Sequence, residues 1–246
     1  SRLAAGFGPI PSFTGAAVAG MLAGVVTAIL HTKMKIPALL AGILTMIALY
    51  SVNLRVMGKA NLSLLGTDTT FTIIRNMFGL NSAHTTLVVG VLATVLVAVF
   101  MYWFFGTEIG AAIRATGFNQ QMIRAQGVNT DVTIMLGLLI SNALVAISGA
   151  LVAQSNGFAD VGMGTGTIVI GLASVIIGEV LFGTRSFKNC IISVILGSVV
   201  YRIVIAAVLQ MGMPPNDLKL FTSILVAFAL AMPLIKSKFG ARKVVD

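Results

Sequence analysis

The sequence predicts an all-α integral membrane protein, a polytopic bundle of about seven transmembrane helices. Apolar residues make up 57% of the 246 residues and charged residues only 9%, which is too few to cover the surface of a soluble domain. The apolar residues also gather in runs close to the roughly 20 residues that a helix needs to cross a bilayer. In hydrocarbon the backbone must satisfy its own hydrogen bonds, so we expect these runs to be helices.

Seven such runs follow one another along the chain. They cover residues 13–30, 36–52, 86–105, 132–153, 165–183, 190–209 and 219–235. We expect them to form one transmembrane domain over residues 1–246. Glycines cluster from Gly157 to Gly166, just before the fifth run, which makes residues 154–183 a candidate broken or re-entrant helix beside a cavity. An ordinary outer loop is the alternative.

The positions of Lys and Arg between the runs indicate the topology. The basic residues of the shorter connections and the tail are Lys33, Lys35, Arg114, Arg124, Arg185, Lys188, Lys236, Lys238, Arg242 and Lys243. They fall on one side if every run crosses once, and the positive-inside rule makes that side the cytoplasm. Residues 53–85, 154–164 and 210–218 are then expected outside, although the first of these segments also carries basic residues. Ser1 is outside as well, so we expect further helices upstream.

Several classes of function are not favoured by the sequence. The net charge is +9, but the basic residues do not form an amphipathic face with interleaved aromatics, so no nucleic-acid binding is expected. Cys190 is the only cysteine, and His31 and His84 are placed outside the spans, which argues against a metal cluster or an intramembrane enzyme. No Gly-x-x-x-x-Gly-Lys-Ser/Thr motif for ATP phosphates is present. We expect no catalytic residue, cofactor or metal.

The polar segment 106–131, on the predicted cytoplasmic side, is the most patterned part of the chain. Thr107 suits the start of a helix, Gly117 can break that helix, Asn119 can cap a second one, and Gly127 can end it. We therefore expect two short helices, joined at an angle, at the cytoplasmic surface. The alternative is a solvated loop whose arginines only set the topology.

This segment resembles the cytoplasmic loop of a known family, the permeases of the branched-chain amino acid and ribose type of ABC importer. That loop has the pattern Gly-x-x-x-Arg-Ala-x-Gly-x-Asn, with a further Arg and Gly downstream. The matching residues are Gly110, Arg114, Ala115, Gly117, Asn119, Arg124 and Gly127. The resemblance implies coupling helices that dock on an ATP-hydrolysing subunit, where an exposed Arg makes directional hydrogen bonds.

Two further stretches are similar to a narrower subgroup, the permeases paired with substrate-binding lipoproteins of the tryptophan and tyrosine type. They are HTKMKIPALLAGILTMIALYSVNLRVMGKANLSLLG, from His31, and GFADVGMGTGTIVIGLASVIIGEVLFG, from Gly157. The resemblance covers essentially the whole chain and implies a multi-pass protein of the bacterial plasma membrane. Its implied partners are an ABC ATPase subunit, a second permease subunit forming a homodimer, an extracytoplasmic lipoprotein and the lipid bilayer.

The function that the resemblance implies is ATP-driven import of a small organic solute, first of all an amino acid and within that class an aromatic one. An ABC permease for another solute, such as a nucleoside or sugar, is an alternative. A secondary transporter driven by an ion gradient is another, but such proteins usually place carboxylates at mid-membrane. Here Glu179 lies about one turn from the cytoplasmic end of its run.

Four polar residues are candidates for the translocation path: Asn142, Asn156, Glu179 and Arg202. Glu179 and Arg202 are the clear charges within the runs, and intramembrane ionisable residues are functional candidates. Arg202 lies about 18 Å from the cytoplasmic end, so the two depths differ too much for an ion pair. Glu179 can reach the interface instead, and hydrogen bonds between helices are the alternative explanation for the two asparagines.

Small residues and one aromatic residue in the runs have structural interpretations. Gly20 and Gly24 form a Gly-x-x-x-Gly face, and Gly137 and Ser141 form a similar one, which is typical of closely packed membrane helices. Trp103 lies near the cytoplasmic end of its run, where an indole ring can anchor the helix in the interface.

Overall fold

The computed structural model describes residues 8–64, 66–79, 81–164 and 166–212, and positions 220, 221, 224, 227 and 231. Helices dominate this part of the chain, so the predicted all-α class is confirmed. Six described helical segments are long and apolar enough to cross a membrane, namely Pro11–Thr32, Ala38–Met57, Ser82–Phe104, Thr130–Asn156, Val161–Phe182 and Phe187–Gln210. The first six predicted runs overlap these segments, and the seventh, residues 219–235, lies largely outside the described residues.

The chain divides into two compact units, Ser1–Met163 and Gly164–Asp246, here called unit 1 and unit 2. Each unit is described by itself. The polar segment 106–131 lies wholly within unit 1, so the candidate site can be built from that unit alone.

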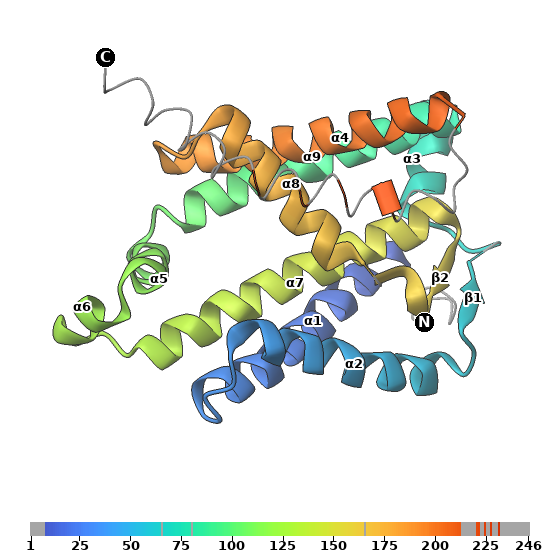
Figure 1. Ribbon diagram of the computed structural model, residues 1–246. Helices are drawn as coiled ribbons and strands as arrows, with labels where there is room; N and C mark the ends of the chain where they lie inside the picture. Colours follow the sequence, from blue (N-terminus) through green and yellow to red (C-terminus); the bar gives the residue numbers. More distant parts are fainter. Residues whose placement is uncertain are drawn as a thin grey trace, which may run out of the picture. The chain divides into compact units, whose positions relative to one another are not determined.

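The core of unit 1 is the packed pair of α1 (Pro9–Thr32) and α7 (Thr130–Asn156), drawn in blue and yellow-green in Figure 1. Glycine makes this contact close. A Cβ atom on Gly20 would collide with the carbonyl oxygen of Asn142, and one on Gly24 would lie 2.7 Å from the carbonyl oxygen of Leu138. The predicted role of this Gly-x-x-x-Gly face in helix packing is therefore confirmed.

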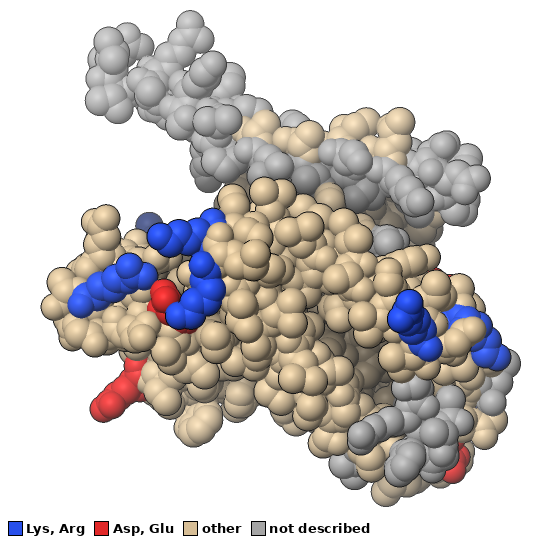
Figure 2. Space-filling model, turned by 90° about the horizontal axis from the view of Figure 1, so that it is seen from below, with Lys and Arg blue, Asp and Glu red and all other residues tan. Residues whose placement is uncertain are grey.

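Two further long helices complete unit 1. The helix α2 (Ala38–Met57) packs on α1, where the Thr27 hydroxyl donates to the Thr45 hydroxyl over 2.9 Å. The helix α4 (Ser82–Phe104) leaves most of its apolar side chains exposed, which suits a helix in contact with lipid. Figure 2 shows one face of the molecule, where the visible Lys and Arg side chains form two groups separated by a wide uncharged band.

The connections between the helices of unit 1 lie at its two ends, in the grouping that the predicted topology requires. The strands β1 (Asn61–Ser63) and β2 (Phe158–Asp160) pair antiparallel, with Leu62 opposite Ala159, so segments 53–85 and 154–164 meet at one end. We call it the β1–β2 end. The helices α5 (Glu108–Phe118) and α6 (Gln120–Ala125) lie at the other end, as Figure 1 shows. The small strand pair was not predicted.

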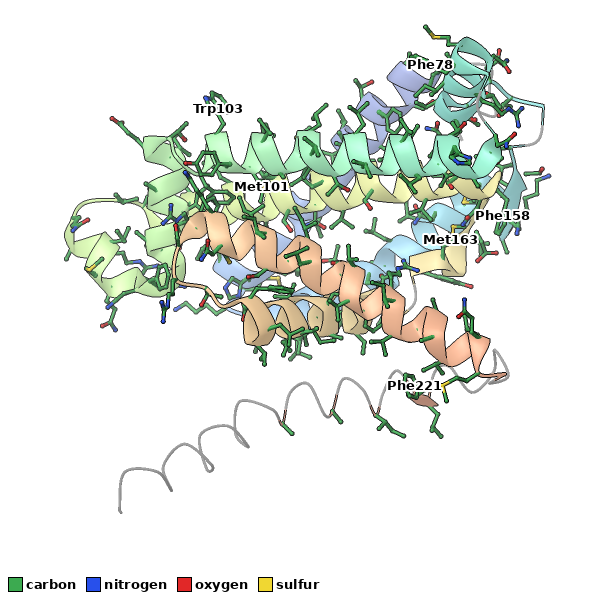
Figure 3. The ribbon with its side chains drawn as sticks, turned by 90° about the horizontal axis from the view of Figure 1, so that it is seen from above. Phe78, Met101, Trp103, Phe158, Met163 and Phe221 are labelled. Atoms are coloured by element: carbon green, nitrogen blue, oxygen red, sulfur yellow. The ribbon has the colours of Figure 1, made fainter. Side chains whose placement is uncertain are left out.

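The helix α3 (Thr70–Phe78) belongs to the β1–β2 end and leads into α4. Figure 3 shows Phe78 in this region and Trp103 at the opposite end of α4, pointing away from the neighbouring helices. Trp103 is 66% exposed, as expected for a side chain that anchors the helix in the membrane interface.

Unit 2 is built on α8 (Thr167–Phe182) and α9 (Phe187–Gln210). A Cβ atom on Gly178 would collide with the carbonyl oxygen of Ser193, so these two helices also approach closely through glycine. Ahead of α8, the chain is irregular: α7 ends at Gly157 with φ +74°, followed by β2 and the 3₁₀ turn η1 (Val161–Gly164). This irregular stretch joins α7 to α8, and the broken or re-entrant helix over residues 154–183 stays a prediction.

Candidate functional site

The site begins where the chain leaves α4 and turns into α5. The Thr107 side chain accepts a hydrogen bond from the N–H of Gly110 over 3.3 Å, so the predicted helix start is confirmed. Gly110 is buried, and a Cβ atom there would collide with the carbonyl oxygen of Phe104 and lie 2.5 Å from Cα of Phe105. The tight turn between α4 and α5 therefore requires glycine.

The two short helices are present, but they join at Asn119 rather than at Gly117. Helix α5 continues through Gly117 to Phe118, so the prediction that Gly117 breaks it is wrong. Asn119 leaves helical conformation, with φ −155° and ψ 100°, and its Oδ1 accepts from the N–H of Met122 over 3.0 Å. One residue ends α5 and caps α6, because an asparagine side chain can replace the missing backbone acceptor.

The second helix ends as predicted. Gly127 has φ +86°, and its N–H donates to the carbonyl of Arg124 over 3.0 Å. A left-handed residue just after a helix is usually glycine, because other residues carry a Cβ penalty there. The chain then enters α7, whose first turn is capped by the Asn129 side chain.

Polar contacts attach both short helices to the start of α7. The hydroxyls of Thr116 and Thr133 lie 2.9 Å apart and are buried, which fixes α5. Arg124 fixes α6: its Nη2 lies 3.2 Å from Oδ1 of Asp131, and its Nε donates to the hydroxyl of Thr130. The Arg124 guanidinium thus contacts the chain's own α7 while its side chain is 60% exposed, and its role toward an ATPase partner stays a prediction.

The outward surface of α5 and α6 combines one cation with apolar side chains. Arg114 is exposed, and its Nη1 lies 3.4 Å from the carbonyl oxygen of Phe105, while Ala115 next to it is half-buried. Phe118 is 88% exposed and Met122 47%. Arg114 and Phe118 are four residues apart and share a face of α5. We call Arg114, Phe118 and Met122 the coupling surface; the two apolar members were missed because the family pattern does not include them.

A cavity of about 260 Å³ lies behind the two helices. Its lining residues are His31, Ile113, Thr116, Gly117, Gln120, Thr133, Ile134, Gly137 and Leu138. His31 lies in the last turn of α1, with Nδ1 2.8 Å from the carbonyl oxygen of Ile36, and His84 lies in the first turn of α4. The prediction that both histidines lie outside the helical spans is therefore wrong, because these helices extend beyond the apolar runs.

Two of the four candidates for the translocation path, Asn142 and Asn156, lie in unit 1, and the other two, Glu179 and Arg202, lie in unit 2. Asn142 is half-buried and donates to the carbonyl of Leu138 in its own helix over 2.9 Å, while Asn156 is exposed roughly four turns further along α7. Glu179 and Arg202 are exposed on α8 and α9, and no ion pair joins them in the described part of unit 2. Their role in transport stays a prediction.

The structure also identifies a polar contact that sequence reasoning missed. Gln154, near the end of α7, is 4% exposed, and its Oε1 accepts from the backbone N–H of Thr70 over 2.9 Å. An amide directly after a long apolar run was a signal for it. Its partner lies 84 residues away, so no local pattern could have named that partner.

Comparison with known proteins agrees with this architecture. A family model described as "Branched-chain amino acid transport system / permease component" matches residues 3–231. The "Tyrosine transport system permease protein" of Clostridioides difficile (strain R20291) is 40% identical over 226 residues, which is 92% of this chain and 74% of that protein. An uncharacterized protein of Rickettsia prowazekii (strain Madrid E) is 33% identical over 234 residues, 92% of this chain and 79% of that protein.

No solved structure matches the chain. The family match covers far more than half of the 246 residues, and the helices of spanning length suit it. The resemblance to the tyrosine-type subgroup is therefore confirmed. The chain belongs to the branched-chain amino acid permease family of bacterial ABC transport systems, as a multi-pass protein of the plasma membrane.

Proposed function

We propose that this chain is the membrane-spanning subunit of an ATP-driven importer, which moves a small organic solute, first of all an amino acid, across the membrane and takes it from an extracytoplasmic binding protein. The observation that carries the proposal is the family match over residues 3–231, joined to a relative whose name specifies tyrosine transport. An aromatic amino acid is accordingly our first choice of solute. ATP hydrolysis belongs to a separate partner subunit.

The coupling surface supports the proposal physically. A partner that pushes on α5 and α6 moves α7 only if the short helices are fixed to it, and the buried Thr116–Thr133 contact and the Arg124–Asp131 pair provide that connection. On the outward side, Phe118 offers apolar area and Arg114 offers directional hydrogen-bond donors. Both properties suit a protein partner.

The remaining members of the family pattern have distinct proposed roles. Gly110 permits the close turn against α4, Asn119 and Gly127 shape α6, and Gly117 leaves room in the cavity behind α5. A second, identical permease subunit would complete the path, with the coupling segment 106–131 on the cytoplasmic side and the β1–β2 end outside.

The test is uptake by proteoliposomes that contain the purified permease, the ATPase and the binding protein encoded with it. We expect tyrosine uptake that requires internal ATP, the binding protein and a permease dimer detectable by cross-linking. Uptake by the permease alone, driven by a sodium or proton gradient, would overturn the proposal in favour of a secondary transporter. ATP-driven uptake of a nucleoside or sugar instead of an amino acid would correct only the solute.

A further inference from the structure

The β1–β2 end of unit 1, opposite the coupling surface, contains two buried polar atoms whose role the proposed coupling to an ATPase does not explain. They are Nε2 of Gln154 and Oγ1 of Thr70. Neither has a hydrogen-bond partner within the described residues, although Gln154 is 4% exposed. A buried donor without a partner is unfavourable, so each such atom in a folded protein needs an explanation.

The orientation of the Gln154 amide follows from its other contact. The backbone N–H of Thr70 can only donate, so the atom 2.9 Å from it must be the side-chain oxygen. Flipping the amide would place two donors against each other. Nε2 therefore points away from the Thr70 N–H and presents two N–H donors inside the protein.

The surroundings of these atoms are a fixed frame. Thr69 and Thr72 form a reciprocal capping box at the start of α3, with the Thr69 N–H 2.7 Å from the Thr72 hydroxyl. On the other side, the N–H of Leu64 donates to the carbonyl of Gly157 over 2.9 Å and extends the β1–β2 ladder. Donors held in this way are already in place for a ligand and need not be ordered when it binds.

The unpaired atoms and the field around them favour one kind of ligand group. An amide N–H₂ and a hydroxyl can both donate to an oxygen, and they lie at the N-terminus of a nine-residue helix, where the helix dipole favours negative charge. Basic residues Arg55, Lys59 and Arg75 also outnumber Asp68 and Asp160 in the segments that meet at this end. These three basic residues are the ones in segment 53–85 that depart from the positive-inside rule.

We propose that Gln154 Nε2 and Thr70 Oγ1 bind the carboxylate of the transported amino acid as it passes from the binding protein into the permease. The proposal rests on the proposed function. Neutral donors hold a carboxylate without a fixed ion pair, so the solute can also leave, and a transport path requires such weak binding. The two atoms lack partners in this conformation because the solute supplies the acceptor.

The test compares two substitutions at position 154 in the reconstituted complex. Gln154→Glu keeps an oxygen for the Thr70 N–H and changes only the unpaired end, from a donor to an anionic acceptor. Gln154→Met removes both ends. If Gln154 only caps α3, the loss of uptake in each variant should follow its loss of stability, which a buried unpaired carboxylate also causes, and should vanish when uptake is compared at equal amounts of folded complex. If Gln154 binds a carboxylate, Glu should be worse than Met because it repels the solute.

We expect the rate of tyrosine uptake at saturating loaded binding protein to fall at least tenfold for Gln154→Glu and less for Gln154→Met. Thr70→Val, which removes the hydroxyl at nearly constant shape, should lower it severalfold. Complex yield, thermal unfolding and ATPase activity without binding protein are the folding controls. Uptake by Gln154→Glu that equals or exceeds uptake by Gln154→Met overturns the carboxylate site and leaves the importer assignment intact. If the parental complex transports only solutes that lack a carboxylate, both this site and the amino acid assignment are overturned.

Discussion

Arg124 of α6 forms an ion pair with Asp131 in the first turn of α7, with 3.2 Å between Nη2 and Oδ1. The relationship makes the second short helix part of the α7 assembly rather than a free loop. The side chains are 60% and 37% exposed, so solvent screens the pair, and it contributes less than about 1 kcal/mol to stability. Its effect should therefore appear in transport more than in folding.

The first prediction concerns this pair. Arg124→Ala and Asp131→Ala should each slow ATP-driven uptake severalfold, because force on α6 would reach α7 less directly. The double substitution should slow uptake no more than the more damaging single substitution does, since each single substitution already removes the same contact. Uptake rates of the three variants in proteoliposomes provide the check, with thermal unfolding as the control. Additive losses would mean that Arg124 acts on a partner instead.

A matched pair of glycines in α5 gives the second prediction. Gly110→Ala should impair assembly of the site, because a methyl group there would collide with the carbonyl oxygen of Phe104. Gly117→Ala should be tolerated and stabilise α5 by up to about 1 kcal/mol, because nothing lies within 4 Å of the added carbon and alanine is the better helix former. Thermal unfolding and uptake of both variants test this, and equal damage by both would contradict it.

The contrast between these glycines shows what the sequence could and could not predict. Both occur in the family pattern, but only Gly117 was interpreted from the sequence as a residue that breaks a helix. Spans and helix caps were predictable because bilayer thickness and capping are local rules, as at Thr107, Asn119 and Gly127. The end of α5 was predicted too early because Gly117 is permitted, not required, to break a helix. The contact of Gln154 with Thr70 depends on tertiary packing over 84 residues.

The third prediction tests the coupling surface. Arg114→Ala should lower ATP-driven uptake about tenfold or more, because a charge-assisted hydrogen bond to the ATPase contributes about 1.5–3 kcal/mol and 1.4 kcal/mol is a factor of ten. Lys33→Ala is the control, since it removes an exposed cation from the connection between α1 and α2. Copurification of the ATPase and uptake are measured. Parental uptake by Arg114→Ala would remove the functional role of the coupling surface.

The fourth prediction concerns the core of unit 1. Gly24→Ala should destabilise the protein by about 1–3 kcal/mol, since the added carbon would lie 2.7 Å from the carbonyl oxygen of Leu138 and force α1 away from α7. Gly42→Ala in α2 should be neutral or stabilising, because its Cβ would meet open space. The midpoint of thermal unfolding in detergent compares the two variants. A Gly24→Ala protein as stable as the parent would show that the helices can separate at little cost.

The last prediction is the topology of unit 1. The pairing of β1 with β2 and the position of α5 and α6 at the other end place position 120 and position 59 at opposite ends of the same helices. After replacement of Cys190, Gln120→Cys should be labelled by an impermeant thiol reagent only in permeabilised cells, and Lys59→Cys in intact cells. Both positions are exposed, so accessibility within the protein does not limit the reaction. Labelling of Gln120→Cys from outside would invert the topology. The coupling surface would then face away from the cytoplasm, where ATP is available, and could not receive force from an ATPase.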